Sequence, residues 1–521
     1  MRTQVHHLVR EAARAHEDAP ALTYNDLTVT YAEFWRDVTR FSTALQGMGI
    51  GRGERVAVYL NKRIETVTAL FGTSAGGGVF VPINPLLRAK QVGYIMRDCG
   101  ARVLVTSADR LAQLREELRE CGSVEHVVLV DAEPAAGPAE RYTVSPWPAA
   151  IESDAFTANA IDTDIAAIMY TSGSTGQPKG VVLSHRNLIA GAESVSHYLG
   201  NTPDDVILSA LPLSFDAGLS QLTTAANVGA HVVLLNYALP VDVVRLCAQH
   251  RVTGLTGVPP LWIQIARQDW PREAAEHLRY FANTGGRMPK TTLDKLRSLF
   301  PEASPFLMYG LTEAFRSTYL DPAQVDRRPD SIGKAIPNAE ILVVRPDGSV
   351  CDPGEEGELV HRGALVALGY WNDPVRTAER FRPVPAREPS LCTEEMAVWS
   401  GDIVVRDEDG FLYFVGRNDE MIKTSGYRVS PAEIEEVAYG TGLVSDAVAL
   451  GVEDAKLGQH IVLVVSPASG GAVDIDSLLA RMRPTIPQYM LPKRVEIKTE
   501  IPRSPNGKFD RALLRKELTL A

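Results

Sequence analysis

The sequence has few cysteines, no long apolar segment and no excess of basic residues. Its five cysteines are far apart and odd in number, which argues against a C-x-x-C metal or redox motif and favours reduced thiols. No stretch reaches the roughly 18 consecutive apolar residues of a membrane span, and residues 1–10 lack the apolar core of a signal peptide. The formal net charge of −11 argues against nucleic acid as a partner. These absences predict a soluble, cytoplasmic protein that binds neither nucleic acid nor membrane.

What the sequence does contain is a regular alternation of apolar strands and helices. At 521 residues the chain is long enough for more than one domain. In its first part, β-type runs such as 55–60 alternate with segments of helical spacing such as 32–48, which predicts βαβ units around a parallel sheet. From about residue 331, short strands between glycine turns predict a small all-β subdomain. The fold class is therefore α/β, and we place the domains at 1–418 and 419–521.

Residues 168–183 carry the strongest local signal. Two short apolar runs flank a loop that holds three glycines, four hydroxyl side chains and Lys179. Because glycine has no Cβ, backbone N–H groups in such a loop can turn toward an anion, and Lys179 supplies a charge suited to phosphate oxygens. The loop is not a Walker A motif, because Pro178 stands five residues after Gly173 and no helix start follows. The pattern predicts a phosphate-binding loop in a β-hairpin; Ser184 then caps the next helix, which places His185 in a surface turn.

Residues 170–180 (Tyr-Thr-Ser-Gly-Ser-Thr-Gly-Gln-Pro-Lys-Gly) resemble the AMP-binding signature of the adenylate-forming superfamily. That superfamily holds acyl-CoA synthetases, adenylation domains of nonribosomal peptide synthesis, and luciferases. Further stretches match it in the expected order, so that the resemblance spans nearly the whole chain: 308–313, 400–402, 416–419, 422–435 and 502–511. The resemblance implies a large N-terminal domain of parallel αβ subdomains plus a small β subdomain, and a mobile, small α+β C-terminal lid domain that carries the catalytic lysine.

The resemblance also implies a role for each matched position, with ATP or AMP and Mg²⁺ as cofactors. Tyr309 would stack on adenine, Asp402 would accept from the ribose hydroxyls, and Glu313 would ligate the metal. Ser400 departs from the family, which has threonine there, but that position does not bear the ribose contact. Asp419 would be the hinge, and Gly426 would line the entrance for the thiol. The implied catalytic residues are Lys508, Glu313 and Thr312, and the implied nucleotide-binding residues are Thr171, Ser172, Gly173, Ser174, Thr175, Gly176, Lys179, Gly285, Gly286, Tyr309, Gly310, Asp402 and Arg417.

Residues 213–221 are similar to the Phe-Asp block of amino-acid adenylation domains, in which the aspartate binds the ammonium group of the substrate. Here that residue is Asp216, whose simpler interpretation is a turn residue, since Asp-Ala-Gly suits a bend. Arg316 would pair with a second substrate carboxylate, or alternatively with Glu313 or solvent. By the same resemblance, the acyl pocket is lined by Phe215, Asp216, Ala217, Ser220, Ala282, Thr284, Met308, Arg316 and Ser317.

These positions predict activation of a small amino-containing carboxylic acid, aspartate-like or a β-amino acid with a second carboxylate, to an aminoacyl-adenylate. The acyl group would pass to the phosphopantetheine thiol of a discrete carrier protein in natural-product biosynthesis, because no carrier motif follows Lys508. The alternative is an AMP-forming acyl-CoA ligase that uses free CoA, and similar blocks occur in ligases from bacterial exopolysaccharide and sorting loci. A non-catalytic nucleotide-binding regulator is a third interpretation; Lys508, Glu313 and Asp402 argue against it, because such a protein would be expected to lack the lysine or the metal ligand.

Overall fold

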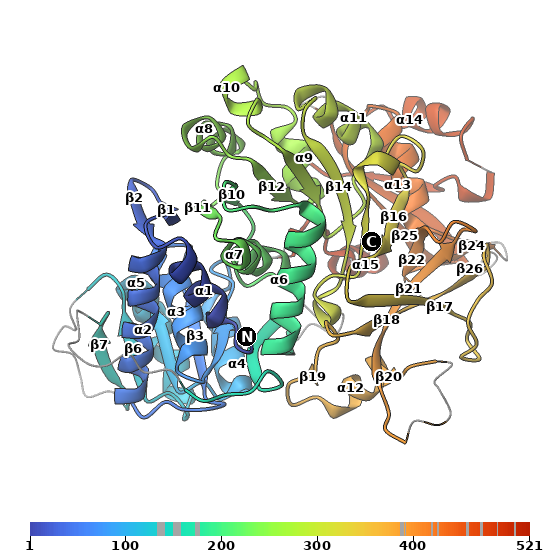
Figure 1. The fold of residues 1–521 in the computed structure, drawn as a ribbon. Coiled ribbons are helices and arrows are strands. Elements are labelled where there is room, and N and C mark those ends of the chain that lie inside the picture. Colours follow the sequence, from blue (N-terminus) through green and yellow to red (C-terminus); the bar gives the residue numbers. More distant parts are fainter. Residues whose placement is uncertain are drawn as a thin grey trace.

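The computed structural model describes residues 1–132, 141–148, 158–171, 178–385, 390, 392–417, 420–424, 427–454, 458–468, 473–486, 488–504 and 507–520. We call residues 1–417 the large lobe and residues 420–520 the small lobe; Figure 1 shows the small lobe in orange and red. Seven residues predicted to be functional fall outside the described ranges, namely Ser172, Gly173, Ser174, Thr175, Gly176, Asp419 and Gly426.

The N-terminal half of the large lobe contains an eight-stranded sheet in the order β19-β9-β8-β4-β3-β5-β6-β7. Its strands are parallel from β8 to β7, and β9 pairs antiparallel with β8 from Ile165↔Ser184 to Thr171↔Lys179. This pairing confirms the hairpin predicted around the glycine loop. The strands are β3 (Arg55–Tyr59), β4 (Val79–Pro82), β5 (Val103–Thr106), β6 (His126–Leu129), β7 (Thr143–Pro146), β8 (Ile165–Thr171), β9 (Lys179–Ser184) and β19 (Gly369–Tyr370).

Five helices belong to this half of the lobe (blue in Figure 1). They are α1 (His6–Ala15), α2 (Tyr31–Gly47), α3 (Ile64–Ala75), α4 (Ala89–Cys99) and α5 (Ala108–Glu120). Helix α2 begins at a capping box. Thr30 Oγ1 accepts from the Glu33 N–H, and the Glu33 carboxylate accepts from the Thr30 N–H.

The second sheet has fourteen strands in the described residues and a parallel centre, β11-β10-β12-β13-β14. The strands of this part are β1 (Pro20–Tyr24), β2 (Leu27–Thr30), β10 (Val206–Ser209), β11 (His231–Leu234), β12 (Gly254–Gly257), β13 (Tyr280–Asn283) and β14 (Ser304–Tyr309). Its helices are α6 (His185–Leu199), α7 (Asp216–Val228), α8 (Pro240–His250), α9 (Pro259–Ile265), α10 (Arg272–Ala275) and α11 (Lys290–Leu299).

The β-rich region predicted after residue 331 is present, but it continues the second sheet rather than forming a separate one. β15 pairs antiparallel with β14, β16 with β15, and β22 with β16. The elements are η1 (Thr312–Ala314), β15 (Thr318–Leu320), η2 (Pro322–Gln324), β16 (Ser331–Ala335), β17 (Ala339–Val344), β18 (Glu356–Gly363), α12 (Pro374–Arg380), β20 (Phe381–Pro383), β21 (Met396–Arg406) and β22 (Leu412–Arg417).

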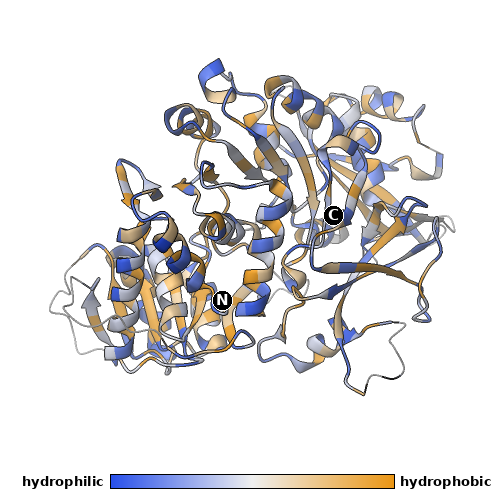
Figure 2. Cartoon of the chain, viewed as in Figure 1, coloured by the Kyte–Doolittle hydropathy of each residue, from blue (hydrophilic) through white to orange (hydrophobic). Residues whose placement is uncertain are grey.

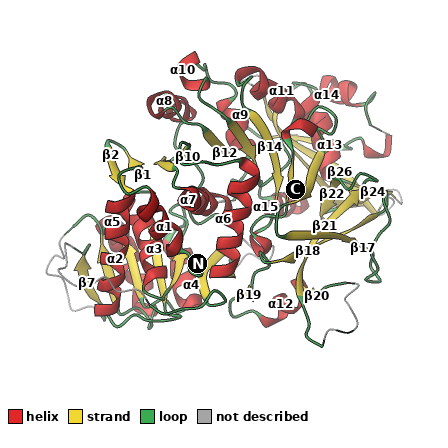
Figure 3. Ribbon diagram, viewed as in Figure 1, coloured by secondary structure: helices red, strands yellow, loops and turns green. Residues whose placement is uncertain are grey.

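The small lobe is an α+β unit built on a five-stranded sheet in the described residues, with the order β24-β23-β26-β25 and β27 paired to β26. Figure 3 shows its helices beside these strands. The elements are β23 (Ile422–Thr424), β24 (Tyr427–Val429), α13 (Pro431–Gly440), β25 (Val444–Asp454), β26 (Gly458–Pro467), α14 (Ile475–Met482), η3 (Gln488–Met490), β27 (Arg494–Ile497) and α15 (Arg511–Leu520).

The cores lie between helices and sheets. Central strands such as β5 and β12 are buried along their whole length, and Figure 2 shows hydrophobic strands between helices with hydrophilic outer faces. This is the burial pattern of parallel sheets covered on both faces. None of the helices in the described ranges is long and apolar enough to cross a membrane.

Candidate active site

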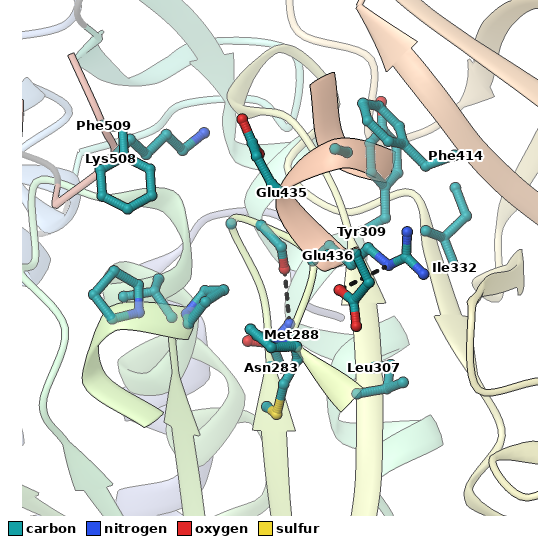
Figure 4. Close-up of a pocket in the computed structure, with 18 of the residues that line it drawn as sticks. Asn283, Met288, Leu307, Tyr309, Ile332, Phe414, Glu435, Glu436, Lys508 and Phe509 are labelled. Carbon is teal, nitrogen blue, oxygen red and sulfur yellow. Dashed lines mark hydrogen bonds and ion pairs between the residues drawn. The ribbon is translucent and has the colours of Figure 1, made fainter. Parts of the chain in front are cut away.

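A pocket of about 400 Å³ lies where the small lobe meets the large lobe. The large lobe contributes the start of α9, residues 285–289, the end of β14 and parts of β16, β21 and β22, whereas the small lobe contributes α13 and residues 507–509. Figure 4 shows side chains of both lobes around the pocket. Its volume is in the range of small-molecule sites.

Tyr309, Asp402 and Arg417, which the sequence predicts to hold adenine and ribose, lie together in this pocket. The Tyr309 O–H donates to Asp402 Oδ2 (2.5 Å), and Arg417 Nε lies 3.5 Å from Asp402 Oδ1. Burial raises the pKa of Asp402, and the positive charges of Arg417 and Lys508 oppose this shift. Burial also raises the pKa of Tyr309, so its phenol stays protonated and donates. The cluster offers an aromatic face and a carboxylate acceptor, as a nucleoside requires.

Gly285 and Gly286, which the sequence predicts to bind the nucleotide, line the same pocket. Gly285 has a φ of 75°, and a Cβ there would lie 3.2 Å from Val258 Cγ1. A Cβ on Gly286 would lie 3.3 Å from Pro259 Cγ. Asn283 supports the turn, because its Nδ2–H donates to the Gly286 carbonyl (2.8 Å). The two glycines therefore keep the pocket wall free of side chains and its backbone accessible.

Lys508 reaches the pocket from a tight turn of the small lobe. The Ser504 N–H donates to the Lys508 carbonyl (2.7 Å), and Gly507 takes a φ of 78° between them. Arg503 supports the turn, since Nη1 donates to the Gly507 carbonyl (3.0 Å) and Nη2 to Asp446 Oδ1 (2.7 Å). Figure 4 shows Lys508 and Phe509 on one side of the pocket and Tyr309 on the other. The loop thus reaches the pocket that Tyr309 and Asp402 also line.

Glu313, Lys179 and Tyr370 form a second polar cluster. Lys179 Nζ donates to Glu313 Oε1 (2.9 Å) and to the Tyr370 hydroxyl (2.8 Å), and the Tyr370 O–H donates to Glu313 Oε1 (2.6 Å). Burial favours a higher pKa for Glu313, but the charge of Lys179 and the bond from Tyr370 outweigh it and lower the pKa to about 2. Glu313 is therefore ionised at neutral pH. Thr312, which the resemblance implies to be catalytic, begins the 3₁₀ helix η1 that contains Glu313.

The donor set at Glu313 fits magnesium. No group of three or more His, Cys, Asp or Glu that could hold a metal occurs in the part of the chain that the structure describes. Mg²⁺ does not need such a cage, because it keeps several waters and binds through one or two carboxylates together with substrate phosphates. The ionised Glu313 supplies one such carboxylate, and Lys179 beside it supplies a charge for phosphate.

The predicted acyl-pocket residues are only partly brought together. Ala217, Ser220, Met308 and Arg316 line a small cavity of about 20 Å³, and Met308 also lines the larger pocket. The five other predicted lining residues do not line this cavity. Phe215 precedes α7, Asp216 opens it, and Ala282 is buried in β13. The Thr284 N–H donates to the Gly257 carbonyl, and Ser317 Oγ bonds His361 Nδ1 (2.9 Å).

Asp216 and Arg316, each predicted to bind a charged group of the substrate, pair with each other in the structure. Arg316 Nη1 donates to Asp216 Oδ2 (3.0 Å), and both side chains are buried. Asp216 therefore has a cation of the protein itself where a substrate ammonium was expected, and Arg316 has a carboxylate of the protein. The alternative partner for Arg316, Glu313, pairs with Lys179 instead. Asp216 is the first residue of α7, and Arg316 lies just after η1. The fold brings these two positions together although they are a hundred residues apart in the sequence.

His185 also differs from its prediction. Ser184 does cap α6, with its Oγ accepting from the Asn187 N–H, but His185 is buried rather than in a surface turn. Its Nδ1 accepts from the N–H of Val5 (3.2 Å), the residue immediately before α1.

Sequence reasoning does not assign to the site the charged residues of the small lobe, other than Lys508, that line the larger pocket, which are Glu420, Glu435, Glu436, Asp446, Arg503 and Arg511. Arg511 Nη2 donates to Glu435 Oε1 (2.6 Å), and this part-buried pair joins α13 to the start of α15. Glu435 and Arg511 lie inside stretches that match the superfamily, and this match is the sequence feature that could have indicated a place in the site. Which charges face the pocket depends on how the lobes pack.

Comparisons with known proteins agree with this geometry. Residues 9–371 match the family model described as AMP-binding enzyme, and residues 433–508 match its C-terminal domain. The chain is 31% identical to feruloyl-CoA synthase of Amycolatopsis sp, covering 97% of each chain. It is 32% identical to sulfoacetate–CoA ligase of Cupriavidus necator, covering 97% of this chain and 96% of the relative. The structure of o-succinylbenzoate CoA synthetase from Bacillus subtilis with ATP and a magnesium ion has a TM-score of 0.82 at 26% identity, covering 98% of this chain and 99% of the other.

These matches confirm the predicted superfamily, the α/β fold with a C-terminal domain, and ATP, AMP and Mg²⁺ as cofactors. The chain therefore belongs to the AMP-binding enzyme family and is an AMP-forming acid–thiol ligase.

Proposed function

We propose that the protein is an acid–CoA ligase, which activates a small carboxylic acid as its adenylate and passes the acyl group to the thiol of CoA. The observation that carries this proposal is that Lys508, Tyr309 and Asp402 line one pocket although they come from different lobes. A reaction between an acid and ATP requires a cation near the reacting anions and a site for the adenosine, and this pocket offers Lys508 for the first and Tyr309 and Asp402 for the second.

The chemistry follows from charge. The substrate carboxylate and the α-phosphate of ATP repel each other, so positioning and neutralisation lower the barrier. Lys508 would place its ammonium between the two anions and stabilise the charge that develops as the bond forms. Lys179 and the glycine loop would hold the phosphates. Magnesium on Glu313 would supply further positive charge at the phosphates.

CoA is a better-supported acceptor than a carrier protein. The relatives that match the chain along nearly their whole length are CoA ligases. An amino-acid substrate also has less support, because the Asp216 carboxylate that would bind its ammonium is bonded to Arg316. We therefore favour the CoA-ligase alternative of the sequence interpretation over aminoacyl transfer to a carrier.

The test is to incubate the purified protein with ATP, Mg²⁺, CoA and a panel of carboxylic and amino acids, and to measure AMP and thioesters by mass spectrometry. We expect acid-dependent AMP in equal amount to acyl-CoA, and no AMP without acid. The proposal would be contradicted if amino acids were the sole substrates and the thioester formed only on a phosphopantetheinyl carrier protein. That result would support the predicted aminoacyl transfer to a carrier protein instead.

A further inference from the structure

Tyr370 belongs to the polar cluster around Glu313, although it lies outside the short motifs that carry the resemblance to the superfamily. Its O–H donates to Glu313 Oε1 (2.6 Å), and its oxygen accepts from Lys179 Nζ (2.8 Å). Lys179 Nζ also donates to Glu313 Oε1 (2.9 Å) and lies 4.3 Å from the centre of the Tyr370 ring. The three groups form a closed triangle, in which Tyr370 contacts both the predicted metal ligand and the predicted phosphate-binding lysine.

The fold bonds the strand of Tyr370 to the two elements that carry its partners. Tyr370 ends β19, and this strand pairs antiparallel with β9, which begins at Lys179. Three residues before Tyr370, the Ala367 N–H donates to the backbone carbonyl of Glu313 in η1 (2.9 Å). Backbone bonds therefore hold Tyr370 beside two residues that are 134 positions apart in the sequence.

The side chain of Tyr370 has a fixed position. It is 7% exposed, and its ring packs edge-on against Phe381, with 5.5 Å between the ring centres. Its backbone N–H donates to Thr377 Oγ1 (2.9 Å). Gly369 has a φ of 128°, and a Cβ there would lie 2.8 Å from Thr377 Cγ2, so that glycine permits this close contact. Packing and backbone bonds thus hold the phenol in place independently of what Lys179 binds.

Lys179, in contrast, has two partners to serve. Its flexible side chain carries a point charge suited to phosphate, and in the proposed function it holds the phosphates of ATP. The negative charge of the phosphates then competes with Glu313 for the same ammonium. Tyr370 is uncharged and anchored, so its O–H keeps the bond to Glu313 in either case. The orientation of the Glu313 carboxylate then depends on Tyr370.

One oxygen of the Glu313 carboxylate takes both bonds of the triangle. Lys179 and Tyr370 bind Oε1, so that among the described residues Oε2 is the oxygen left for a metal ion. Carboxylates that ligate metals are themselves hydrogen-bonded, and these partners orient the ligand. A bond from a fixed phenol to Oε1 sets the direction of Oε2, which a flexible lysine shared with phosphate does not.

We propose that Tyr370 is a positioning residue for the magnesium site, because its O–H holds the Glu313 carboxylate ready for Mg²⁺ while Lys179 binds the phosphates of ATP. This inference rests on the proposed function, in which Glu313 ligates the metal and Lys179 holds the phosphates. Packing alone needs only the ring of Tyr370, so the hydroxyl is the group to test.

Calorimetry without acid or CoA tests the inference apart from catalysis. The affinity for ATP is measured in excess Mg²⁺ and in EDTA, and the ratio of the two affinities defines the metal gain. Tyr370→Phe keeps the ring but removes the O–H, and we expect its metal gain to lie about tenfold or more below that of the wild type, as for partners that orient metal ligands. The affinity in EDTA should be unchanged, which also shows that the variant is folded.

Three further variants locate the effect. Glu313→Gln should lower the metal gain at least as far as Tyr370→Phe does. In the Glu313→Gln background, Tyr370→Phe should lower it no further, because both changes act on one contact. Tyr31→Phe is the matched control, since Tyr31 is also buried, donates its O–H to the Ala230 carbonyl (2.6 Å) and does not line the pocket. It should leave the metal gain as in the wild type.

The outcomes separate the two proposals. A metal gain that Tyr370→Phe leaves unchanged would overturn the inference, whether or not ATP binds more weakly, because the hydroxyl would then act through Lys179 or the fold. A further loss on adding Tyr370→Phe to Glu313→Gln would overturn it as well. A metal gain that survives Glu313→Gln would contradict Glu313 as the metal ligand, and this inference with it. A reduced metal gain in Tyr370→Phe, together with no acyl-CoA from any acid in the wild type, would support the inference and contradict the ligase function.

Discussion

At the scale of single residues, the proposed reaction depends most on the positive charge of Lys508. Its ammonium lies in the pocket that holds Tyr309 and Asp402, and its charge acts on the Asp402 carboxylate. The turn that carries it is held by Arg503 and Asp446. Position and charge together make it the group that can neutralise two reacting anions.

Replacing Lys508 by alanine should slow adenylate formation by about 10²-fold or more, because a key electrostatic donor is lost in the transition state. ATP binding should change little, since Tyr309 and Asp402 remain. The measurement is the single-turnover rate of AMP formation, with Lys516→Ala as the control, because Lys516 is an exposed lysine of the same lobe. A rate near that of the wild type would show that another group performs this step.

Single residues also show what a sequence can and cannot predict. Tyr309, Asp402 and Lys508 each stand in a short motif of the sequence, and they line one pocket together with Gly285 and Gly286. The Asp216–Arg316 pair was not predictable, because each residue alone suited a substrate charge and only the fold shows that they meet.

At the scale of elements, the contact between α1 and α6 has a pH dependence that can be measured. His6 and His7 on α1 and His185 at the start of α6 are buried together, with His6 Nδ1 3.1 Å from Ser74 Oγ. Burial lowers the pKa of His7 and of His185 to about 4, and lowers that of His6 well below its usual value. The three imidazoles are therefore neutral in the folded protein at neutral pH.

Acidification should destabilise this contact. The ordinary histidine pKa is 6.5, so between pH 6.5 and about 4 the unfolded chain binds protons that the folded chain does not. The free energy of unfolding must then fall as the pH drops through this window. Urea unfolding at a series of pH values should show this slope, and His185→Gln should make it shallower. The exposed His197 of α6 provides the control variant, His197→Gln, which should leave the slope as in the wild type.

The positions of helices and strands can be predicted from the sequence more accurately than the contacts between them. The helix predicted over 32–48 is α2 (Tyr31–Gly47), because the Thr30–Glu33 capping box marks its start. The small β subdomain predicted after residue 331 is present. However, β15 and β16 join its strands to β14, so that they continue the second sheet. The pattern of apolar and polar residues does not predict this pairing, because it does not show which strands are neighbours.

At the scale of the whole molecule, Glu436 connects the two lobes. Glu436 Oε1 on α13 accepts from the Lys290 N–H at the start of α11 (3.2 Å), and Oε2 lies 3.9 Å from Arg287 Nε. A carboxylate at a helix N-terminus is favourable for both the free N–H groups and the helix dipole. The contact exists only in a lobe arrangement that brings α13 against α11, which is also the arrangement that puts Lys508 in the pocket.

Replacing Glu436 by alanine should weaken this arrangement and slow adenylate formation about three- to tenfold, which corresponds to the loss of roughly one charged hydrogen bond at a part-exposed site. Acyl transfer from preformed adenylate to CoA should be unchanged or faster. Glu433→Ala on the exposed face of the same helix is the control. Equal slowing of both half-reactions would show that Glu436 supports the fold of the lobe rather than its orientation.

The account as a whole depends on one pocket that both lobes share around a nucleotide. Hydrogen–deuterium exchange with and without a non-reactive acyl-sulfamoyl adenosine tests this most directly. We expect slower exchange at residues 283–289 and 307–310 of the large lobe and, in the same complex, at residues 507–511 of the small lobe, because these segments contribute side chains to the pocket. Tight binding of the analogue without protection of the small-lobe segment would contradict the account.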